Sequence, residues 1–159
     1  MTGRLAPRAS WSADACSIGR ALEIVSTRSA LLLMREAFYG TTRFADFATR
    51  VGISEPVAAA RLRELVGHGL LAKEDYQEPG QRTRAEYRLT EQGRELFPVL
   101  VALMQWGDRW LASDGPPVVL RHAGCGEPVA AELRCRAGHQ APPDELELAA
   151  SADLDVAPT

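Results

Sequence analysis

The sequence of 159 residues predicts a mainly α-helical domain that carries one small β-hairpin, and residues 43–93 supply the observations that decide this. Two short amphipathic segments are separated only by Gly52 and Ile53, which favours a tight corner between two helices. Two strand-like segments follow, residues 70–76 and 85–89, around a turn-forming stretch. Helix, corner, helix and hairpin in this order predict a winged helix-turn-helix of the α+β class.

The second helix of this unit is predicted to have a buried face and an outward face. The first helix covers residues 44–51, and Ser54 is the expected N-cap of the second, with acidic Glu55 in its first turn. Apolar positions at i, i+4 and i+7 form a stripe of Ala58, Leu62 and Leu65. Arg63 then lies on the outward side. An outward-facing second helix is what insertion into a DNA groove requires.

A longer helix is predicted after the hairpin, from Thr90 as its N-cap to Leu111. Its apolar face consists of Leu96, Leu100, Leu103, Gly107 and Trp110, widened by Phe97, Val101 and Met104. Pro98 lies within this helix and is expected to bend it, because proline has no N–H to donate to the carbonyl of residue 94. A single small domain cannot cover so much apolar surface, which favours a second copy as partner.

Two helices are predicted before the helix-turn-helix. Residues 14–25 repeat apolar side chains at helical spacing, and residues 26–38 contain a continuous apolar block that should be mostly buried. Residues 1–13 have no periodicity and predict a flexible arm. We therefore expect one domain over residues 14–113, ended by a stretch rich in Gly and Pro.

The net charge of −3 is unevenly distributed along the chain. Residues 142–159 hold five acidic residues and no basic one, so residues 1–141, with 18 basic and 16 acidic residues, carry +2. The acidic end predicts a disordered tail. No apolar run of about 18 residues and no signal-peptide pattern is present, so we expect a cytoplasmic protein. Its three cysteines then argue against a disulfide framework.

The sequence resembles the HxlR family of bacterial regulators, a branch of winged-helix proteins related to the MarR type. The matching pieces are Cys16, LLLMRE at Leu31 to Glu36, Gly40 followed by Arg43-Phe44, Ile53-Ser54, RLRELVGHGLL at Arg61 to Leu71, and EYRLTEQG at Glu86 to Gly93. Their order and spacing are specific, and the resemblance covers residues 14–112. It implies a homodimer built from terminal helices, whose two-fold symmetry matches a palindromic operator in double-stranded DNA.

The resemblance also singles out two positions for signal reception. Cys16 occupies the family's redox-sensing position at a helix start, where the helix dipole favours a thiolate. The alternative is that Cys16 is a small buried apolar residue. Many relatives carry tryptophan where this chain has Ser29, so a void there would admit a small-molecule effector unless a neighbour such as Trp11 fills it.

Six residues are predicted to contact DNA: Arg43, Ser54, Arg61, Arg63, Arg82 and Arg84. Reading of base edges should depend mainly on Arg63, with Arg61, because arginine can form a bidentate pair with guanine. Arg82 and Arg84 at the hairpin tip would contact phosphates or the minor groove. The alternative for these two arginines is a solvated turn, since acidic residues lie close by in the sequence.

Residues 114–141 form a separate extension that contains two His/Cys pairs. His122 and Cys125 are three residues apart, and Cys135 and His139 are four residues apart, with Gly near both pairs. Two thiolates and two imidazoles make a complete tetrahedral set for zinc. The alternatives are a coincidental grouping or an oxidisable couple between the two cysteines.

These features predict a sequence-specific, dimeric DNA-binding transcriptional regulator that responds to a thiol-reactive compound or a small molecule. The sequence contains no nucleophile elbow and no phosphate-binding loop, and its three histidines are not arranged with a nucleophile, so no enzyme activity is expected. A rival prediction is a winged-helix module that binds protein or a ligand. Pro56, Ala59 and Ala60 on the second helix support this rival, because their side chains cannot hydrogen-bond a base edge.

Overall fold

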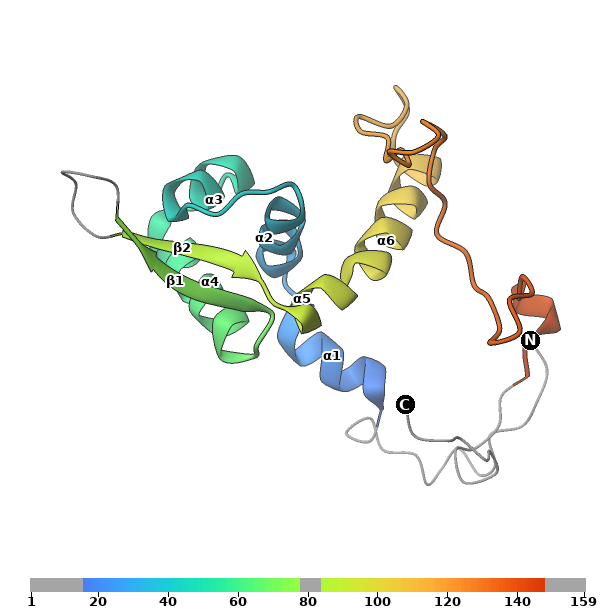
Figure 1. Cartoon of the computed structure of the whole chain (residues 1–159), viewed down its shortest axis with the longest axis horizontal. Coiled ribbons are helices and arrows are strands. Elements are labelled where there is room, and N and C mark those ends of the chain that lie inside the picture. The colour runs from blue at the N-terminus through green and yellow to red at the C-terminus, as the bar shows by residue number, and fades with distance from the viewer. Residues whose placement is uncertain (1–15, 78–83, 148–159) are drawn as a thin grey trace.

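The computed structural model describes residues 16–77 and 84–147. The helices are α1 (Ser17–Val25), α2 (Arg28–Phe38), α3 (Phe44–Val51), α4 (Glu55–Gly67), α5 (Glu91–Glu95), α6 (Phe97–Trp110) and the short 3-10 helix η3 (Pro143–Glu145); the strands are β1 (Leu71–Tyr76) and β2 (Arg84–Leu89). Figure 1 shows α2, α3 and α4 gathered beside the hairpin, while α6 stands apart and leads into the C-terminal extension. This arrangement is the predicted winged helix-turn-helix, mainly helical with one small hairpin.

The core lies where α2, α3 and α4 meet the base of the hairpin. Its largest fully buried side chains are Phe47, Leu33, Met34, Leu62, Leu65 and Leu71. Complete burial of such a side chain stabilises the fold by about 1.5–3 kcal/mol. The predicted stripe of α4 belongs to this core, since Ala58, Leu62 and Leu65 are all buried.

Two glycines with positive φ shape the ends of the helix-turn-helix. Gly52 has φ of 68° and closes α3 with its N–H on the carbonyl of Ala48. Gly69, with φ of 76°, follows α4 and directs the chain into β1. An L-residue with a side chain seldom adopts this backbone region, so glycine permits both corners.

The hairpin has a third, short partner that the sequence did not predict. Strands β1 and β2 pair antiparallel from Leu71 opposite Leu89 to Tyr76 opposite Arg84. The N–H of Tyr87 also donates to the carbonyl of Thr42 at 2.8 Å, just before α3. This bond fixes the start of α3 against the hairpin.

A buried carboxylate joins α2 to the same region. Glu36 is 6% exposed and accepts from the Arg35 guanidinium at 2.6 Å and from the Thr41 hydroxyl at 3.3 Å. Arg50 of α3 donates to the Thr41 hydroxyl at 3.1 Å. Because each polar group of this network has a partner, burial of the Glu36 charge is compensated.

The predicted single helix from Thr90 to Leu111 is wrong in its continuity. The chain forms α5, breaks at Leu96 and restarts as α6, with Pro98 in the first turn of α6. Proline is tolerated in a first turn, where its missing N–H would have no helical acceptor, but not in a helix interior. The predicted cap is confirmed, since Thr90 accepts from the N–H of Gly93 at 3.0 Å.

The two N-terminal helices are shorter than predicted. Helix α1 begins at Ser17, with Cys16 at the N-cap, and residues 14 and 15 lie outside the described residues. Helix α2 begins at Arg28 because the side chain of Thr27 caps it and accepts from the N–H of Ala30 at 3.1 Å. The predicted flexible arm over residues 1–13 is likewise outside the described residues.

The extension after α6 contributes almost nothing to the core. From Arg121 to Gln140 every residue is exposed. The side chain of Gln105 on α6 holds it at one place, donating to the carbonyl of Val129 at 2.7 Å and accepting from the N–H of Ala131 at 2.9 Å. Among the described residues, no helix has the length and apolar character that crossing a membrane would take.

Candidate nucleic-acid interface

The outward face of α4 carries one long basic side chain among small ones. With Ala58, Leu62 and Leu65 packed inward, the side chain of Arg63 is exposed as predicted. Pro56 and Val57 are also exposed, and Ala59 and Ala60 are half-buried. Such a surface can approach a groove closely, and its small apolar groups suit contact with thymine methyls.

The two arginines of α4 differ in their partners. Arg63 donates through Nε to the carbonyl of Ala59 at 3.2 Å. Arg61 is held by Glu64, with 2.5 Å between Nη1 and Oε2, in an ion pair along the helix surface. Because Arg61 would have to give up this ion pair to contact DNA, it is a weaker candidate for a DNA contact than Arg63.

Ser54 lies at the N-cap position of α4, where the sequence places it, but its hydroxyl makes no capping hydrogen bond. The expected side-chain cap is therefore wrong, although the backbone of Ser54 is extended as an N-cap requires. Its carbonyl accepts the first helical bond, from the N–H of Ala58 at 2.9 Å. The exposed hydroxyl is thus not used for capping and remains at the start of α4.

A second basic group lies where the start of α3 meets the hairpin. Arg43 is at the N-cap of α3, and its backbone forms an isolated antiparallel β-bridge with Glu86 of β2. Its guanidinium lies over the ring of Tyr76, with Cζ 5.5 Å from the ring centroid. Arg84, exposed at the start of β2, faces Tyr76 in the strand register. A hollow between these elements is lined by the basic side chains of Arg43, Arg84 and Lys73 and by one acidic side chain, Asp46 of α3.

Sequence reasoning missed Lys73 as a member of this basic group. Lys73 is exposed on β1, opposite Tyr87 in the register. The alternation of side chains along a strand could have assigned Lys73 to one face of the hairpin. It could not show that this face lies beside the start of α3. Arg82, predicted as a phosphate contact at the hairpin tip, lies outside the described residues.

Two acidic residues of the hairpin share one arginine. Glu74 and Glu86 face one another across β1 and β2, which alone would repel. Arg88 contacts both, at 3.1 Å from Glu74 and 2.5 Å from Glu86, and these carboxylates raise its pKa. One guanidinium offsets only one of these two carboxylates, so the basic side chains around the hairpin must outweigh the remaining negative charge and that of Asp75 when it approaches phosphates.

Comparison with known families decides the class of the protein. The model of the HxlR-like helix-turn-helix family matches residues 24–115. The chain belongs to this family. It is a transcriptional regulator with a helix-turn-helix domain, as the sequence predicted. An uncharacterised HTH-type transcriptional regulator of Mycobacterium tuberculosis is 49% identical over 120 residues, which span 75% of each chain.

Solved structures agree with this assignment. The transcription factor PA1607 is 34% identical and superposes with a TM-score of 0.75 over 85% of this chain and 94% of its own. The family match ends at residue 115, and residues 1–115 are less than three quarters of this chain. Because the match to PA1607 covers 85% of the chain, it must include part of the extension. The reduced form of the redox regulator HypR is 26% identical, with a TM-score of 0.54 over 59% of this chain and 92% of its own.

Cys16, the predicted sensor of this HxlR-like chain, is exposed at the N-cap of α1. The alternative that Cys16 is a buried packing residue is therefore wrong for the single chain. Ser29 is half-buried, with its hydroxyl 3.4 Å from that of Thr27. Trp11, which could compensate for the small Ser29, lies outside the described residues.

The two His/Cys pairs of the extension lie on two separate turns of similar design. In the first, Nδ1 of His122 is 3.3 Å from Sγ of Cys125, and Gly124 leaves room for the imidazole ring. In the second, the N–H of Cys135 donates to the carbonyl of His139 at 3.0 Å. The described residues contain no group of three or more His, Cys, Asp or Glu side chains that could hold a metal ion.

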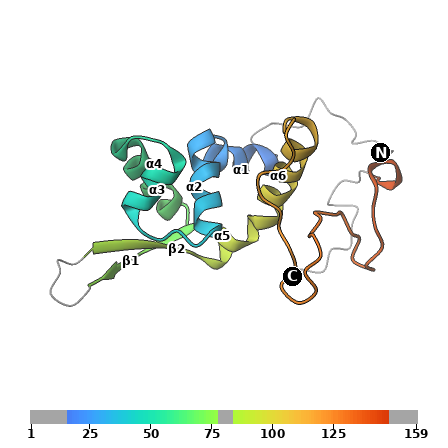
Figure 2. The ribbon, with the colours of Figure 1, turned by 90° about the horizontal axis from the view of Figure 1, so that it is seen from above.

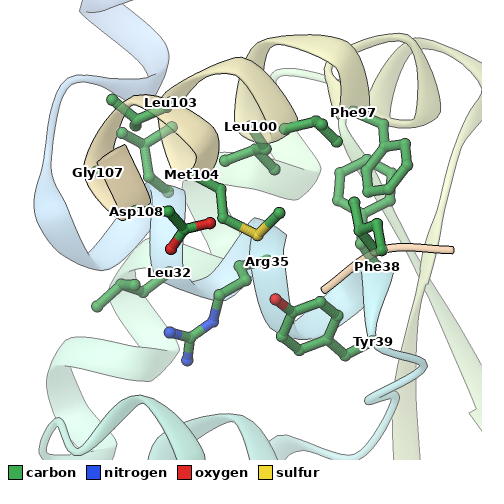
Figure 3. A pocket seen from close by; sticks show the side chains of 13 residues that line it. Leu32, Arg35, Phe38, Tyr39, Phe97, Leu100, Leu103, Met104, Gly107 and Asp108 are labelled. Carbon is green, nitrogen blue, oxygen red and sulfur yellow. The ribbon is translucent and has the colours of Figure 1, made fainter. Parts of the chain in front are cut away.

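A separate pocket of about 290 Å³ lies between α2 and α6, as Figure 3 shows. Its walls come from the apolar side chains Leu31, Leu32, Phe38, Phe97, Leu100, Val101, Leu103 and Met104, with Leu120 of the extension. Much of the α6 face that the sequence assigned to a second copy thus faces α2 instead. Arg35, Tyr39 and Asp108 supply its polar groups.

Proposed function

We propose that this regulator binds a palindromic operator in double-stranded DNA as a homodimer, with α4 of each protomer in a major groove. The observation that carries the proposal is the exposed Arg63 on the outward face of α4, directly opposite the fully buried Ala58, Leu62 and Leu65. A rigid helix with one projecting guanidinium fits direct reading of guanine.

The hairpin and the start of α3 add the sequence-independent part of binding. Arg43, Lys73 and Arg84 flank one hollow beside α3, and all three are exposed. Cationic side chains around a hollow can contact two phosphates of one strand and fix the register of α4 in the groove. Arg88 contacts both carboxylates of the hairpin and offsets one of their two charges during this approach.

Two unpartnered apolar faces support the homodimer. Ile18 of α1 is 70% exposed and Leu22 follows one turn later on the same face. On α6, Trp106 is 55% exposed and Trp110 is 67% exposed. Figure 2 shows α1 and α6 on the same side of the winged helix. A two-fold interface would remove these side chains from water, and apolar burial contributes about 25 cal/mol per Å².

The regulatory input that we propose is a thiol reaction at Cys16. Its side chain is exposed, its carbonyl accepts from the N–H of Arg20 at 3.0 Å, and α1 also carries part of the proposed dimer surface. Modification of Cys16 would therefore act on the packing of the two copies. The likeness to the redox regulator HypR supports this input.

A titration with duplexes from the promoter region beside the gene tests the proposal. We expect tight binding of one duplex by two protein chains, with a scrambled duplex of equal length bound much more weakly. Light scattering of the free protein should give twice the chain mass. If no duplex is preferred, the DNA-reading role is refuted and the interaction module takes its place, as the small apolar Pro56, Ala59 and Ala60 would suit.

A further inference from the structure

We propose that the pocket between α2 and α6 binds a small lipophilic organic cation and that its occupant sets the angle between α6 and the winged helix. The binding step does not depend on the proposed DNA function. Only the consequence of binding, a change in operator affinity, rests on it.

The walls of the pocket suit a flat aromatic ligand. Phe38 and Phe97 approach to 4.6 Å between ring centroids with their planes tilted by 37°, and they close one end. Met104 and Leu100 line the α6 side, as Figure 3 shows. Gly107 has no side chain, and a Cβ added there would meet nothing within 4 Å, so the other end keeps open space. The volume of about 290 Å³ is near the lower limit of ligand pockets and fits one aromatic unit.

The charges around the pocket select a cation. The guanidinium of Arg35 is engaged by the buried Glu36 through two hydrogen bonds, at 2.6 and 3.2 Å, so these two charges offset one another. Within the described part of the chain, the carboxylate of Asp108 has no hydrogen bond and no ion pair. Figure 3 shows this carboxylate directed into the space between Met104 and Arg35. The pocket therefore offers one uncompensated negative charge.

Aromatic faces strengthen the preference for positive charge. The rings of Phe38, Phe97 and Tyr39 all border the pocket, and the negative face of an aromatic ring attracts an organic cation. The guanidinium of Arg35 already lies over the Tyr39 ring, 5.9 Å from its centroid, so Phe38 and Phe97 are the rings that would meet the ligand. An anion would instead meet Asp108 at short range and find only part of the Arg35 donor set, because Nε and Nη2 already donate to Glu36. A neutral molecule would gain only the apolar contacts.

The position of the pocket couples it to both proposed interfaces. Helix α2 forms one wall and packs its buried Leu33 and Met34 in the core that holds α3 and α4. Helix α6 forms the other wall and presents the exposed Trp106 and Trp110. The break at Leu96 separates α6 from α5, so side-chain contacts at the pocket fix the direction of α6. A ligand between the two walls would change the spacing of the two recognition helices in a dimer.

Calorimetry on the full chain without DNA tests the binding step. The probes are benzyltrimethylammonium, the neutral benzyl alcohol and the anionic phenylacetate, which share one ring and differ in charge. We expect the cation to bind on the order of tenfold more tightly than the alcohol, and phenylacetate not to bind. Equal binding of all three probes, or preference for phenylacetate, would overturn the proposal.

Matched variants locate the site. Asp108→Asn should lose the tenfold preference for the cation while keeping benzyl alcohol binding, and Asp114→Asn, an exposed acidic residue after α6, should change nothing. Gly107→Leu should fill the pocket and abolish binding of both molecules, with an unchanged thermal melt showing that the chain still folds. If the cation does not bind and Gly107→Leu dissociates the dimer, a second copy occupies the pocket and the proposal fails.

Operator titrations with and without saturating benzyltrimethylammonium test the coupling. We expect the cation to change operator affinity in the parent protein and in Asp114→Asn at the same concentration, whereas Asp108→Asn should need about ten times more cation for the same change. Unchanged affinity with a saturated pocket would refute the coupling. A protein that binds the cation but no DNA would refute the proposed function alone.

Discussion

The Nε of Arg63 donates to the carbonyl oxygen of Ala59 at 3.2 Å, one turn earlier on α4. This bond uses only Nε. Within the described residues, the two terminal nitrogens of Arg63 make no hydrogen bond, so both can donate to a bidentate acceptor. Ala59 therefore orients the arginine without consuming it. A pre-oriented guanidinium loses less side-chain entropy when it meets a base than a freely rotating one.

Replacement of Arg63 by Ala should cost about 1–3 kcal/mol of operator binding and relax specificity, because a bidentate base contact is lost. Fluorescence anisotropy with operator and scrambled duplexes measures both effects. Arg136→Ala, which removes an exposed arginine of the extension, is the matched control and should bind as the parent does. Unaltered affinity and selectivity in Arg63→Ala would contradict this docking of α4.

Replacement of Arg84 by Ala should weaken operator and scrambled duplexes alike. Its exposed guanidinium at the start of β2 is expected to neutralise one phosphate, so the slope of log affinity against log salt should fall by about 1. Titrations at several salt concentrations measure the slope. A loss confined to the operator would instead assign base reading to Arg84.

Stability should decline in alkali through ionisation of Tyr87. Burial raises the pKa of this phenol above its ordinary value of 10.0, while the positive charge of Arg63 opposes the shift to a smaller extent. The neutral phenol packs edge-on against Phe47, with centroids 6.1 Å apart. Because the folded pKa is raised, its contribution to stability is complete below pH 10.0 and is lost as pH rises through the folded value.

Denaturant unfolding at pH 8 and above pH 10 tests this dependence. Tyr87→Phe should stay within about 1 kcal/mol of the parent at pH 8, because only a hydroxyl is removed, and should lose less stability in alkali. Tyr39→Phe, which alters an exposed tyrosine, should behave as the parent does. Identical alkaline behaviour of Tyr87→Phe and the parent would show that another group titrates.

Treatment with a quinone or a disulfide stressor should change operator affinity through Cys16. All three cysteines are exposed, so the response must be assigned by substitution. Cys16→Ser should remove the response, whereas a chain with both Cys125 and Cys135 replaced by Ser should retain it. If Cys16→Ser responds like the parent, Cys16 has no sensing role.

The zinc hypothesis for the extension predicts about one zinc ion per chain in protein purified without chelator. The ion would have to draw the two turns together, since His122 and Cys125 form a pair that Cys135 and His139 do not join in this structure. Cys125→Ser should lose the metal. Cys16→Ser should keep it, and metal-free protein with freely titratable thiols would end the hypothesis.

Local pattern was enough for the order of elements as far as the hairpin. The stripe of Ala58, Leu62 and Leu65, the corner at Gly52 and the cap at Thr90 depend on residues within a turn or two of one another, and the structure confirms all three. Hydrophobic period and backbone preference are short-range properties, so a single sequence reveals them. The family resemblance followed from the spacing of the same pieces.

Tertiary structure alone decided which distant residues meet. The bond from Tyr87 to Thr42, the placement of Lys73 beside Arg43, and the pocket between α2 and α6 join segments tens of residues apart. The sequence showed that α6 has a wide apolar face, but periodicity states which side chains are apolar and not what covers them. Packing against Phe38 turned part of that face toward α2 and left Trp106 and Trp110 in water.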